Sequence, residues 1–370
     1  MSETAQRPPW VPPGGGEGFT TSVMAGIAAP ARTPRRFAVR RTPSVQELVD
    51  GIFAGERAKV SRAITLVESN APAHRPMARE ILRRIADKPG FAHRVGISGV
   101  PGAGKSTFIE ALGNHLCDAG RRVAVLAVDP SSSLTRGSIL GDKTRMETLS
   151  RREECFIRPS PSSGALGGVT RKTRETIAVC EAAGFDTVLI ETVGVGQSEI
   201  AVRAMVDCFL LILIAGAGDE LQGMKKGIFE IADVLLVNKA DGENKIRADA
   251  TRLEFERVMH YLSPATEGWK PPVLAASSVT RAGIADVWLA VENYFVHVES
   301  DGAFDRRRSD QAIAWWQALV EQELRVRFLS TPAIAEVSAR LEREILTGRL
   351  APSLAAEELL EQAGLPVQHA

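Results

Sequence analysis

Residues 99–107 read Gly99-Val100-Pro101-Gly102-Ala103-Gly104-Lys105-Ser106-Thr107. They follow an apolar run at residues 95–98 and precede an amphipathic stretch at residues 107–119. A glycine-rich turn between a strand and a helix lets backbone N–H groups face nucleotide phosphates, and the helix N-terminus adds positive charge there. We expect Lys105 to reach the β- and γ-phosphates and Ser106 to bind Mg²⁺ through its hydroxyl. The segment therefore predicts a phosphate-binding loop.

A second motif concerns the base. Asn238-Lys239-Ala240-Asp241 comes directly after an apolar run at residues 234–237. The Asp241 carboxylate can accept hydrogen bonds from N1–H and the exocyclic amine of guanine, whereas adenine would leave it unpaired. The tetrapeptide alone also suits a surface turn, but downstream of a phosphate-binding loop it predicts guanine specificity. Ser277, Ser278 and Val279 end the next predicted strand, and we expect them to contact the base through backbone amides.

Three carboxylates are candidates for metal binding and catalysis, together with Lys105. Glu191 ends an apolar run at residues 187–190, where nucleotide-hydrolysing proteins place a metal-binding carboxylate. Asp129 ends the run at residues 123–128, and Asp142 lies in a glycine-containing loop. Asp129 also suits an ordinary turn, but strand carboxyl ends line the ligand crevice of a parallel sheet. We therefore expect Asp129, Asp142 and Glu191 at the Mg²⁺.

The order of predicted elements sets the fold class. Apolar runs at residues 95–98, 123–128, 187–190, 209–214, 234–237 and 273–276 alternate with amphipathic stretches at 107–119, 169–183 and 248–262. Alternating strands and helices, with strands apolar throughout, predict a parallel sheet that helices cover on both faces. The expected fold is a three-layer α/β nucleoside-triphosphatase domain with a parallel-rich central sheet.

Four regions follow along the chain. Residues 1–43 hold seven prolines, six arginines and two acids, which predicts a disordered tail, although a mitochondrial transit peptide would also be rich in arginine. Residues 44–90 show three short helical patterns and form an N-terminal helical extension. Residues 91–300 are the nucleotide-binding domain. Residues 301–370 are charged and helical, and Trp315-Trp316 there needs a partner surface to be buried.

Composition limits the other roles. Lys and Arg total 45, as do Asp and Glu, so neither nucleic acid nor an anionic membrane is an expected partner. The 4 cysteines are far apart, which indicates buried small hydrophobes and a reducing compartment. No apolar run is long enough to span a bilayer. We expect a soluble, cytoplasmic protein.

Taken together, these motifs resemble the MeaB/ArgK family of GTPases, which includes the methylmalonic aciduria type A protein. The matching stretches are residues 100–107, Val128-Asp129-Pro130-Ser131-Ser132, residues 137–146, Phe156-Ile157-Arg158-Pro159, residues 191–199 and residues 218–227. The resemblance runs from Ser44 into the C-terminal region. The family usually has paired glycines before Ser138, whereas here Arg136 precedes Gly137, a change that can re-aim the first switch loop.

The resemblance implies a function. Members bind GTP and Mg²⁺, and hydrolyse GTP to gate adenosylcobalamin delivery to a B12-dependent acyl-CoA mutase, methylmalonyl-CoA mutase or a close relative, which they also protect or reactivate. The cobalamin belongs to the mutase, and an adenosyltransferase is a further implied partner. Gly194 and Gln197 fall in one switch, and Asp219, Gln222 and Lys225 in a loop that couples nucleotide state to the mutase. Members are homodimers joined through C-terminal helices.

Other interpretations use the same motifs. An ATP-dependent transport kinase would need an adenine site, which residues 238–241 disfavour. A nickel-insertion GTPase usually carries a histidine-rich tract, and this chain has none among its 6 histidines. A scaffold that binds nucleotide without hydrolysis would not need three carboxylates. No arginine is clearly placed to accelerate hydrolysis; Arg145, Arg158 and Arg171 are candidates by residue type only, so we expect slow intrinsic turnover.

Overall fold

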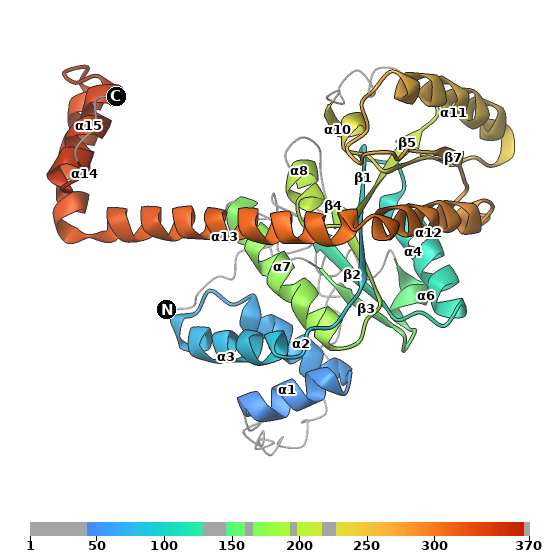
Figure 1. Cartoon of the computed structure of the whole chain (residues 1–370), viewed down its shortest axis with the longest axis horizontal. Coiled ribbons are helices and arrows are strands. Elements are labelled where there is room, and N and C mark those ends of the chain that lie inside the picture. Colours follow the sequence, from blue (N-terminus) through green and yellow to red (C-terminus); the bar gives the residue numbers. More distant parts are fainter. Residues whose placement is uncertain (1–42, 129–145, 160–165, 193–197, 217–226, 366–370) are drawn as a thin grey trace, which may run out of the picture. The chain divides into compact units, whose positions relative to one another are not determined.

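Seven strands form one sheet at the centre of the fold (Figure 1). The computed structural model describes residues 43–128, 146–159, 166–192, 198–216 and 227–365. The strands are β1 (His93–Gly99), β2 (Val123–Val128), β3 (Cys155–Arg158), β4 (Thr187–Thr192), β5 (Cys208–Ile214), β6 (Val234–Asn238) and β7 (Val273–Ala275). Their order is β3-β2-β4-β1-β5-β6-β7, and all neighbours run parallel. The carboxyl ends of all the strands therefore meet at one edge.

Helices cover both faces of this sheet, as the three-layer prediction requires. Strand side chains alternate between the faces, so Leu189 joins one apolar cluster while Val188 and Ile190 join the other. The first cluster contains α4 (Lys105–Asp118), α6 (Glu147–Ser150) and α12 (Ile284–Ser300). The second contains α7 (Leu166–Ala182), α8 (Ser198–Arg203), α10 (Gly227–Glu230) and α11 (Lys245–His260). Short 3-10 turns at Pro72–His74 and Gly242–Asn244 connect elements.

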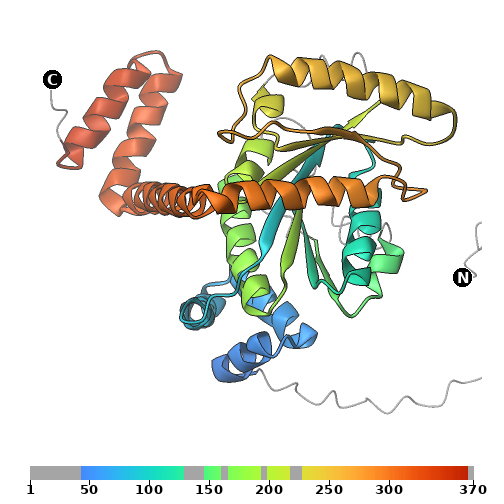
Figure 2. The ribbon, with the colours of Figure 1, turned by 45° about the vertical axis from the view of Figure 1, so that its right-hand side comes forward.

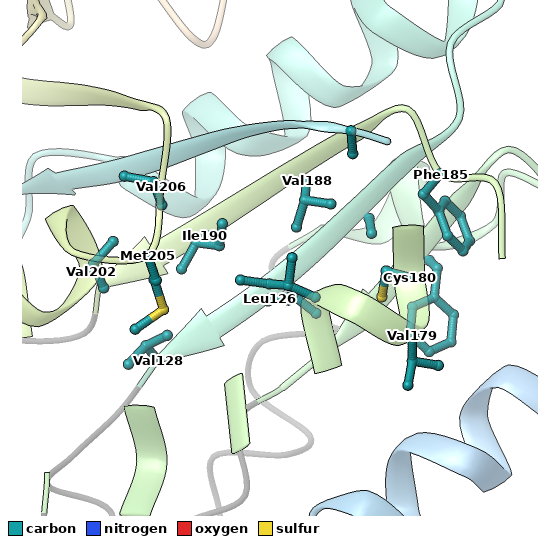
Figure 3. Packing of buried hydrophobic residues seen from close by; sticks show 14 of the residues in the cluster. Leu126, Val128, Val179, Cys180, Phe185, Val188, Ile190, Val202, Met205 and Val206 are labelled. Atoms are coloured by element: carbon teal, nitrogen blue, oxygen red, sulfur yellow. The ribbon is translucent and has the colours of Figure 1, made fainter. Parts of the chain in front are cut away.

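Helix α8 packs unusually close to the sheet. Val202, Met205 and Val206 at its end are fully buried beside Ile190 of β4 and Val128 of β2 (Figure 3). Gly96 of β1 lies beneath them, and a Cβ there would be 2.9 Å from Val202 Cγ1. A glycine in the middle of this strand therefore provides the space that α8 needs.

The N-terminal helices extend the second face of the domain. They are α1 (Val45–Phe53), α2 (Arg57–Val67) and α3 (Arg75–Ala86). Each of the three contacts α7. Ser44 caps α1 by accepting from Glu47 N–H, while the Glu47 carboxylate accepts from Ser44 N–H at 2.7 Å, as the sequence spacing predicts. Leu48, Ile52, Ile64 and Ile81 are completely buried, so this extension shares the core of the nucleotide domain.

The chain ends in three helices, α13 (Ala303–Ser330), α14 (Pro332–Leu346) and α15 (Pro352–Gln362). Helix α13 has 28 residues, and Phe304 is the one side chain among them that is buried. Figure 2 shows α14 and α15 running side by side at the far end of α13. Ile334 and Leu341 are buried in this small pair, whereas most of the apolar side chains of α13 remain exposed.

Two elements of the fold were missing from the sequence-based expectation. Residues 155–158 form edge strand β3, which pairs with β2, although only four residues long. Residues 284–300 form α12, whose Val287, Val291 and Phe295 fill the first core cluster. Among the described residues, no helix has the length and apolar character needed to cross a membrane.

Candidate nucleotide site

The glycine-rich loop lies between β1 and α4, as its sequence predicts. Gly99 ends β1 beside β5, and a Cβ there would be 2.2 Å from the carbonyl oxygen of Ile212. Gly104 precedes α4 with a φ of 85°, a left-handed conformation that glycine adopts without strain. Because Lys105 begins α4, the backbone N–H groups of the first helical turn point toward the loop. This arrangement suits a phosphate group.

Lys105 and Ser106 contact residues on both sides of the loop. Lys105 Nζ donates to the carbonyl oxygens of Gly99 at 2.8 Å and Val100 at 3.2 Å. Burial lowers the pKa of Lys105, and the carboxylates of Glu191 and Glu199 oppose that shift. Ser106 Oγ donates to Glu191 Oε1 at 2.9 Å. A hydroxyl and a buried carboxylate in contact are the oxygen ligands that Mg²⁺ prefers.

A buried pair of hydroxyls joins the strands that carry these groups. Thr192 Oγ1 donates to Ser98 Oγ at 2.9 Å, and both side chains are fully buried. Ser98 precedes Gly99, and Thr192 follows Glu191. The pair therefore connects β1 to β4 beside the phosphate loop and the candidate metal carboxylate. Sequence reasoning missed it, because a serine and a threonine within apolar strands carry no distinctive motif.

Asn238 links the base-reading segment to the phosphate loop. Its Nδ2 donates to the carbonyl oxygen of Ala103 at 2.8 Å. Its Oδ1 accepts from Ser278 Oγ at 2.8 Å and from Ser278 N–H at 3.3 Å. Gly104 makes this approach possible, because a Cβ there would be 2.8 Å from Asn238 Nδ2. Asn238 is therefore a buried bridge among three segments that the sequence separates widely.

Asp241 is held next to that bridge. Ser277 Oγ donates to Asp241 Oδ2, and Thr280 N–H donates to Ser277 Oγ at 3.1 Å. Lys239 adopts a φ of 60°, rare for a non-glycine residue, and its carbonyl oxygen accepts from Asn244 Nδ2 at 2.7 Å. The end of β6 and the segment after β7 thus bring Asn238, Lys239 and Asp241 together with Ser277 and Ser278.

Two of the backbone amides that were expected to contact the base have partners within the protein. Ser277 N–H donates to the Ala282 carbonyl oxygen at 3.0 Å, and Ser278 N–H donates to Asn238. These two amides are used within the protein, while Val279 is 79% exposed. Base contacts through residues 277–279 stay a prediction. The side chains of Ser277 and Ser278 donate to Asp241 and Asn238.

Several predicted site residues lie outside the described residues. They are Asp129, Asp142, Gly194, Gln197, Asp219, Gln222 and Lys225. Arg145, an arginine considered for hydrolysis, also lies outside. Arg158 pairs with the buried carboxylate of Glu68, the residue after α2, and Arg171 pairs with Glu175 at 3.0 Å. Both arginines are therefore engaged in ion pairs within the protein.

The sheet, the loop between β1 and α4, and the carboxylate at the end of β4 define a P-loop nucleotide-binding protein. Residues 60–333 match the family model described as methylmalonyl Co-A mutase-associated GTPase MeaB. The chain belongs to this family and is a GTPase of the P-loop class.

Similar proteins agree with that membership. A probable GTPase of Mycobacterium tuberculosis is 52% identical over 322 residues, which cover 87% of this chain and 96% of the relative. The mouse mitochondrial methylmalonic aciduria type A homolog is 43% identical, over 86% of this chain and 79% of its own. The Escherichia coli GTPase ArgK is 46% identical over 76% of this chain and 85% of its own length. A crystal structure described as an LAO/AO transport system kinase superposes with a TM-score of 0.71 at 35% identity. The superposition covers 86% of this chain and 97% of the other.

Proposed function

We propose that this protein hydrolyses GTP as a switch that controls a B12-dependent acyl-CoA mutase. In this role it gates adenosylcobalamin delivery to the mutase and protects or reactivates it, with methylmalonyl-CoA mutase or a close relative as the client. The observation that carries the proposal is the family match over residues 60–333, a range that includes the whole described nucleotide site. Relatives named for methylmalonic aciduria support the same client.

The geometry supports GTP as the nucleotide. Asn238 ties the base-reading segment to Ala103, so a base beside Asp241 and phosphates on the loop would occupy one continuous site. The Asp241 carboxylate would accept from guanine N1–H and the exocyclic amine. In ATP the corresponding ring nitrogen is an acceptor, and two acceptors facing each other in a partly buried site would weaken binding.

The roles of the phosphate-side residues follow from their contacts. Lys105 would exchange its two carbonyl partners on the loop, Gly99 and Val100, for the β- and γ-phosphates. Ser106 and Glu191 would hold Mg²⁺, with Asp129 and Asp142 as further candidates. The metal would neutralise charge that develops on the phosphates. Gly194 and Gln197, with Asp219, Gln222 and Lys225, remain the candidates for passing the nucleotide state to the mutase.

A homodimer through α13 is part of the proposal. Ile313, Trp316, Val320 and Leu324 recur at intervals of three or four residues along α13, and all are exposed. A stripe with that spacing lies on one side of a helix and is the pattern that buries itself against a second helix. An adenosyltransferase is the proposed third component, and neither nucleic acid nor a membrane is proposed as a partner. The proposed compartment is the cytoplasm.

An ATP-dependent transport kinase is the second candidate, because the solved relative at 35% identity is described as one. The two functions differ in nucleotide and product. Competition of unlabelled GTP and ATP against a fluorescent guanine nucleotide separates them. The GTPase function predicts displacement by GTP at concentrations about 100-fold lower than by ATP. Equal displacement, or phosphate transfer to an amino acid, would favour the kinase.

Cofactor loading tests the mutase function itself. An apo-mutase from the same organism is mixed with adenosylcobalamin and this protein, in the presence of GTP or of a non-hydrolysable analogue. The absorbance of the bound cofactor is then followed. Gating predicts that loading with intact cofactor depends on hydrolysis, while an analogue holds the complex in one state. Equal loading with GTP, with the analogue and without the protein would contradict the proposal.

A further inference from the structure

Side chains from α12 and α13 hold the segment that connects α8 to β5. Asp207, in this segment, is 1% exposed, and its carboxylate accepts from Arg308 at 2.6 and 2.9 Å and from Arg94 N–H at 2.9 Å. Its carbonyl oxygen accepts from Arg307 at 2.7 Å and from Tyr294 at 2.9 Å. The end of α8 is therefore fixed to the beginning of α13, the helix that supplies Arg307 and Arg308.

Gln311, one turn further along α13, contacts the last residue of α8 and the segment that follows it. Gln311 Nε2 donates to the carbonyl oxygen of Val206 at 2.9 Å and approaches that of Arg203 at 3.5 Å. Arg174 of α7 donates to the Ala204 carbonyl oxygen from the other side and to the Gln311 carbonyl oxygen at 3.3 Å. The carbonyl groups of Arg203, the last residue of α8, and of Ala204 and Val206 just after it are thus paired with side chains of α7 and α13.

Polar atoms at the same junction lack a partner. Among the residues that the structure describes, the buried atoms Arg174 Nε, Gln311 Oε1 and Trp315 Nε1 make no hydrogen bond. The Arg174 guanidinium lies over the Trp315 ring, 5.3 Å from its centroid. Burial, and then the nearby charge of Arg94, lower the pKa of Arg174 to about 10. Leaving three buried polar atoms unpaired is unfavourable, so the cluster needs an explanation.

The unpaired atoms are complementary to one another. Gln311 Oε1 is an acceptor, while Trp315 Nε1 and Arg174 Nε are donors. Gln311 and Trp315 are four residues apart on α13, so their side chains are neighbours on the helix surface. A cavity of about 480 Å³ beside them, lined by Ala201 of α8 with Trp315 and Leu319 of α13, leaves room for the indole to turn. A small movement could pair all three.

We propose that Gln311 and Arg174 are positioning residues with two arrangements, through which the nucleotide site and helix α13 affect one another. In the arrangement seen here, the Gln311 amide nitrogen holds the end of α8. In the other, Gln311 Oε1 accepts from Trp315 Nε1 and Arg174 Nε, and α8 is released. Helix α8 packs on β1 and β4, the strands that lead to the phosphate loop and carry Glu191, so its position affects both sides of the nucleotide site. The inference rests on the proposed GTP switch.

The coupling works in both directions. A change of nucleotide state that moves α8 also changes which of the two arrangements Gln311 and Arg174 adopt. Conversely, a second chain or a mutase that binds α13 acts on the nucleotide site through the same contacts. This account explains why a long and mostly exposed helix begins with three polar side chains, Arg307, Arg308 and Gln311, that bind the buried segment at the end of α8. A purely structural anchor would have no need of unpaired donors and acceptors.

Tryptophan fluorescence tests the proposal, because hydrogen bonding of the indole N–H changes its emission. Emission of the full-length protein is compared with GDP and with a non-hydrolysable GTP analogue, in the wild type and in Trp315→Phe. We expect the two nucleotide states to differ in the wild type and the difference to be lost in Trp315→Phe. Gln311→Glu keeps the acceptor, removes the amide donor and should give the same Trp315 emission with both nucleotides.

A matched change on the same helix is the control. Gln317 is exposed on α13, so Gln317→Glu adds the same charge without touching α8 and should leave the nucleotide-dependent emission unchanged. In Gln311→Glu the ratio of GTP to GDP affinities, measured by calorimetry, should change by about 5-fold or more, the lower range of measured couplings. Unaltered emission and affinity ratio in Gln311→Glu would overturn the proposal. Failure to bind GTP at all would instead contradict the proposed function.

Discussion

Ser106 and Glu191 show how the fold assembles a site from distant residues. They are separated by 85 positions, yet their side chains meet at 2.9 Å. Ser106 lies in the first turn of α4, and Glu191 lies near the end of β4, which pairs with β1. The parallel register of these neighbouring strands therefore places a hydroxyl beside a carboxylate at the carboxyl edge of the sheet.

Glu191→Gln tests the metal role at this position. The amide keeps the size of the side chain and an oxygen acceptor for Ser106, but it removes the negative charge that Mg²⁺ favours. We expect the Mg²⁺ concentration needed for half-maximal GTP hydrolysis to rise about 10-fold or more. An Mg²⁺ titration of turnover measures it, with the exposed Glu256→Gln as the matched control. An unchanged Mg²⁺ requirement would place the metal elsewhere.

Asp241→Asn tests base recognition. The change replaces an acceptor facing guanine N1–H with an amide whose nitrogen is a donor, so GTP should bind about 10- to 100-fold more weakly, corresponding to one or two charge-assisted hydrogen bonds. Affinity for ATP should not fall by the same factor. Calorimetry with both nucleotides measures the effect, and Asp249→Asn on exposed α11 serves as control. Equal losses for GTP and ATP would indicate damage to the fold.

Sequence predicted the site residues that belong to contiguous motifs. Lys105 and Ser106 follow a glycine pattern, and Asn238 and Asp241 share a tetrapeptide. The sequence alone was therefore enough to name these four residues as candidates. Sequence could not show that Asn238 would donate to Ala103, or that Thr192 would donate to Ser98. Those contacts depend on which strands become neighbours, and single serine and threonine residues give no signal of their own.

At the scale of elements, the close packing of α8 on β1 depends on one residue. A Cβ at Gly96 would lie 2.9 Å from Val202 and 3.0 Å from Val206, both of which are fully buried. Gly96→Ala should therefore destabilise the protein by about 1–3 kcal/mol, the usual cost of overpacking a core. Urea unfolding followed by circular dichroism measures this free energy.

Gly227→Ala provides the matched control for that change. In the part of the chain that the structure describes, no atom lies within 4 Å of a Cβ built at Gly227, and the residue is exposed. The control substitution should leave the free energy of unfolding unchanged or slightly raised, because alanine has fewer unfolded conformations. If Gly96→Ala is as stable as this control, α8 is not packed against β1 as described.

Sequence patterns predicted the main strands but missed β3 and α12 for different reasons. Residues 155–158 are too short for a periodic pattern, and their pairing with β2 is what makes them a strand. Helix α12 is buried through much of its length, with Val287, Trp288, Val291, Tyr294 and Phe295 in the core. Its apolar positions cover much of the helix surface, so amphipathic spacing was hard to see.

At the scale of the whole molecule, the exposed apolar side chains of α13 lead to a prediction about assembly. Trp316 is 62% exposed and lies in the stripe with Ile313, Val320 and Leu324. Trp316→Glu would place a charge in the proposed helix–helix contact and should convert a dimer into a monomer, weakening association by about 100-fold or more. Light scattering after gel filtration gives the mass. A wild-type protein that is already monomeric would contradict the proposed dimer.

The central claim is that the GTPase responds to a mutase. The most direct test compares GTP turnover by the purified protein with and without an adenosylcobalamin-dependent acyl-CoA mutase from the same organism. A partner that orders the switch segments should raise turnover about 10-fold or more, and Lys105→Ala should abolish both rates. Stimulation that disappears in Lys105→Ala is the predicted result. Intact basal GTP hydrolysis that no such mutase accelerates would contradict the account.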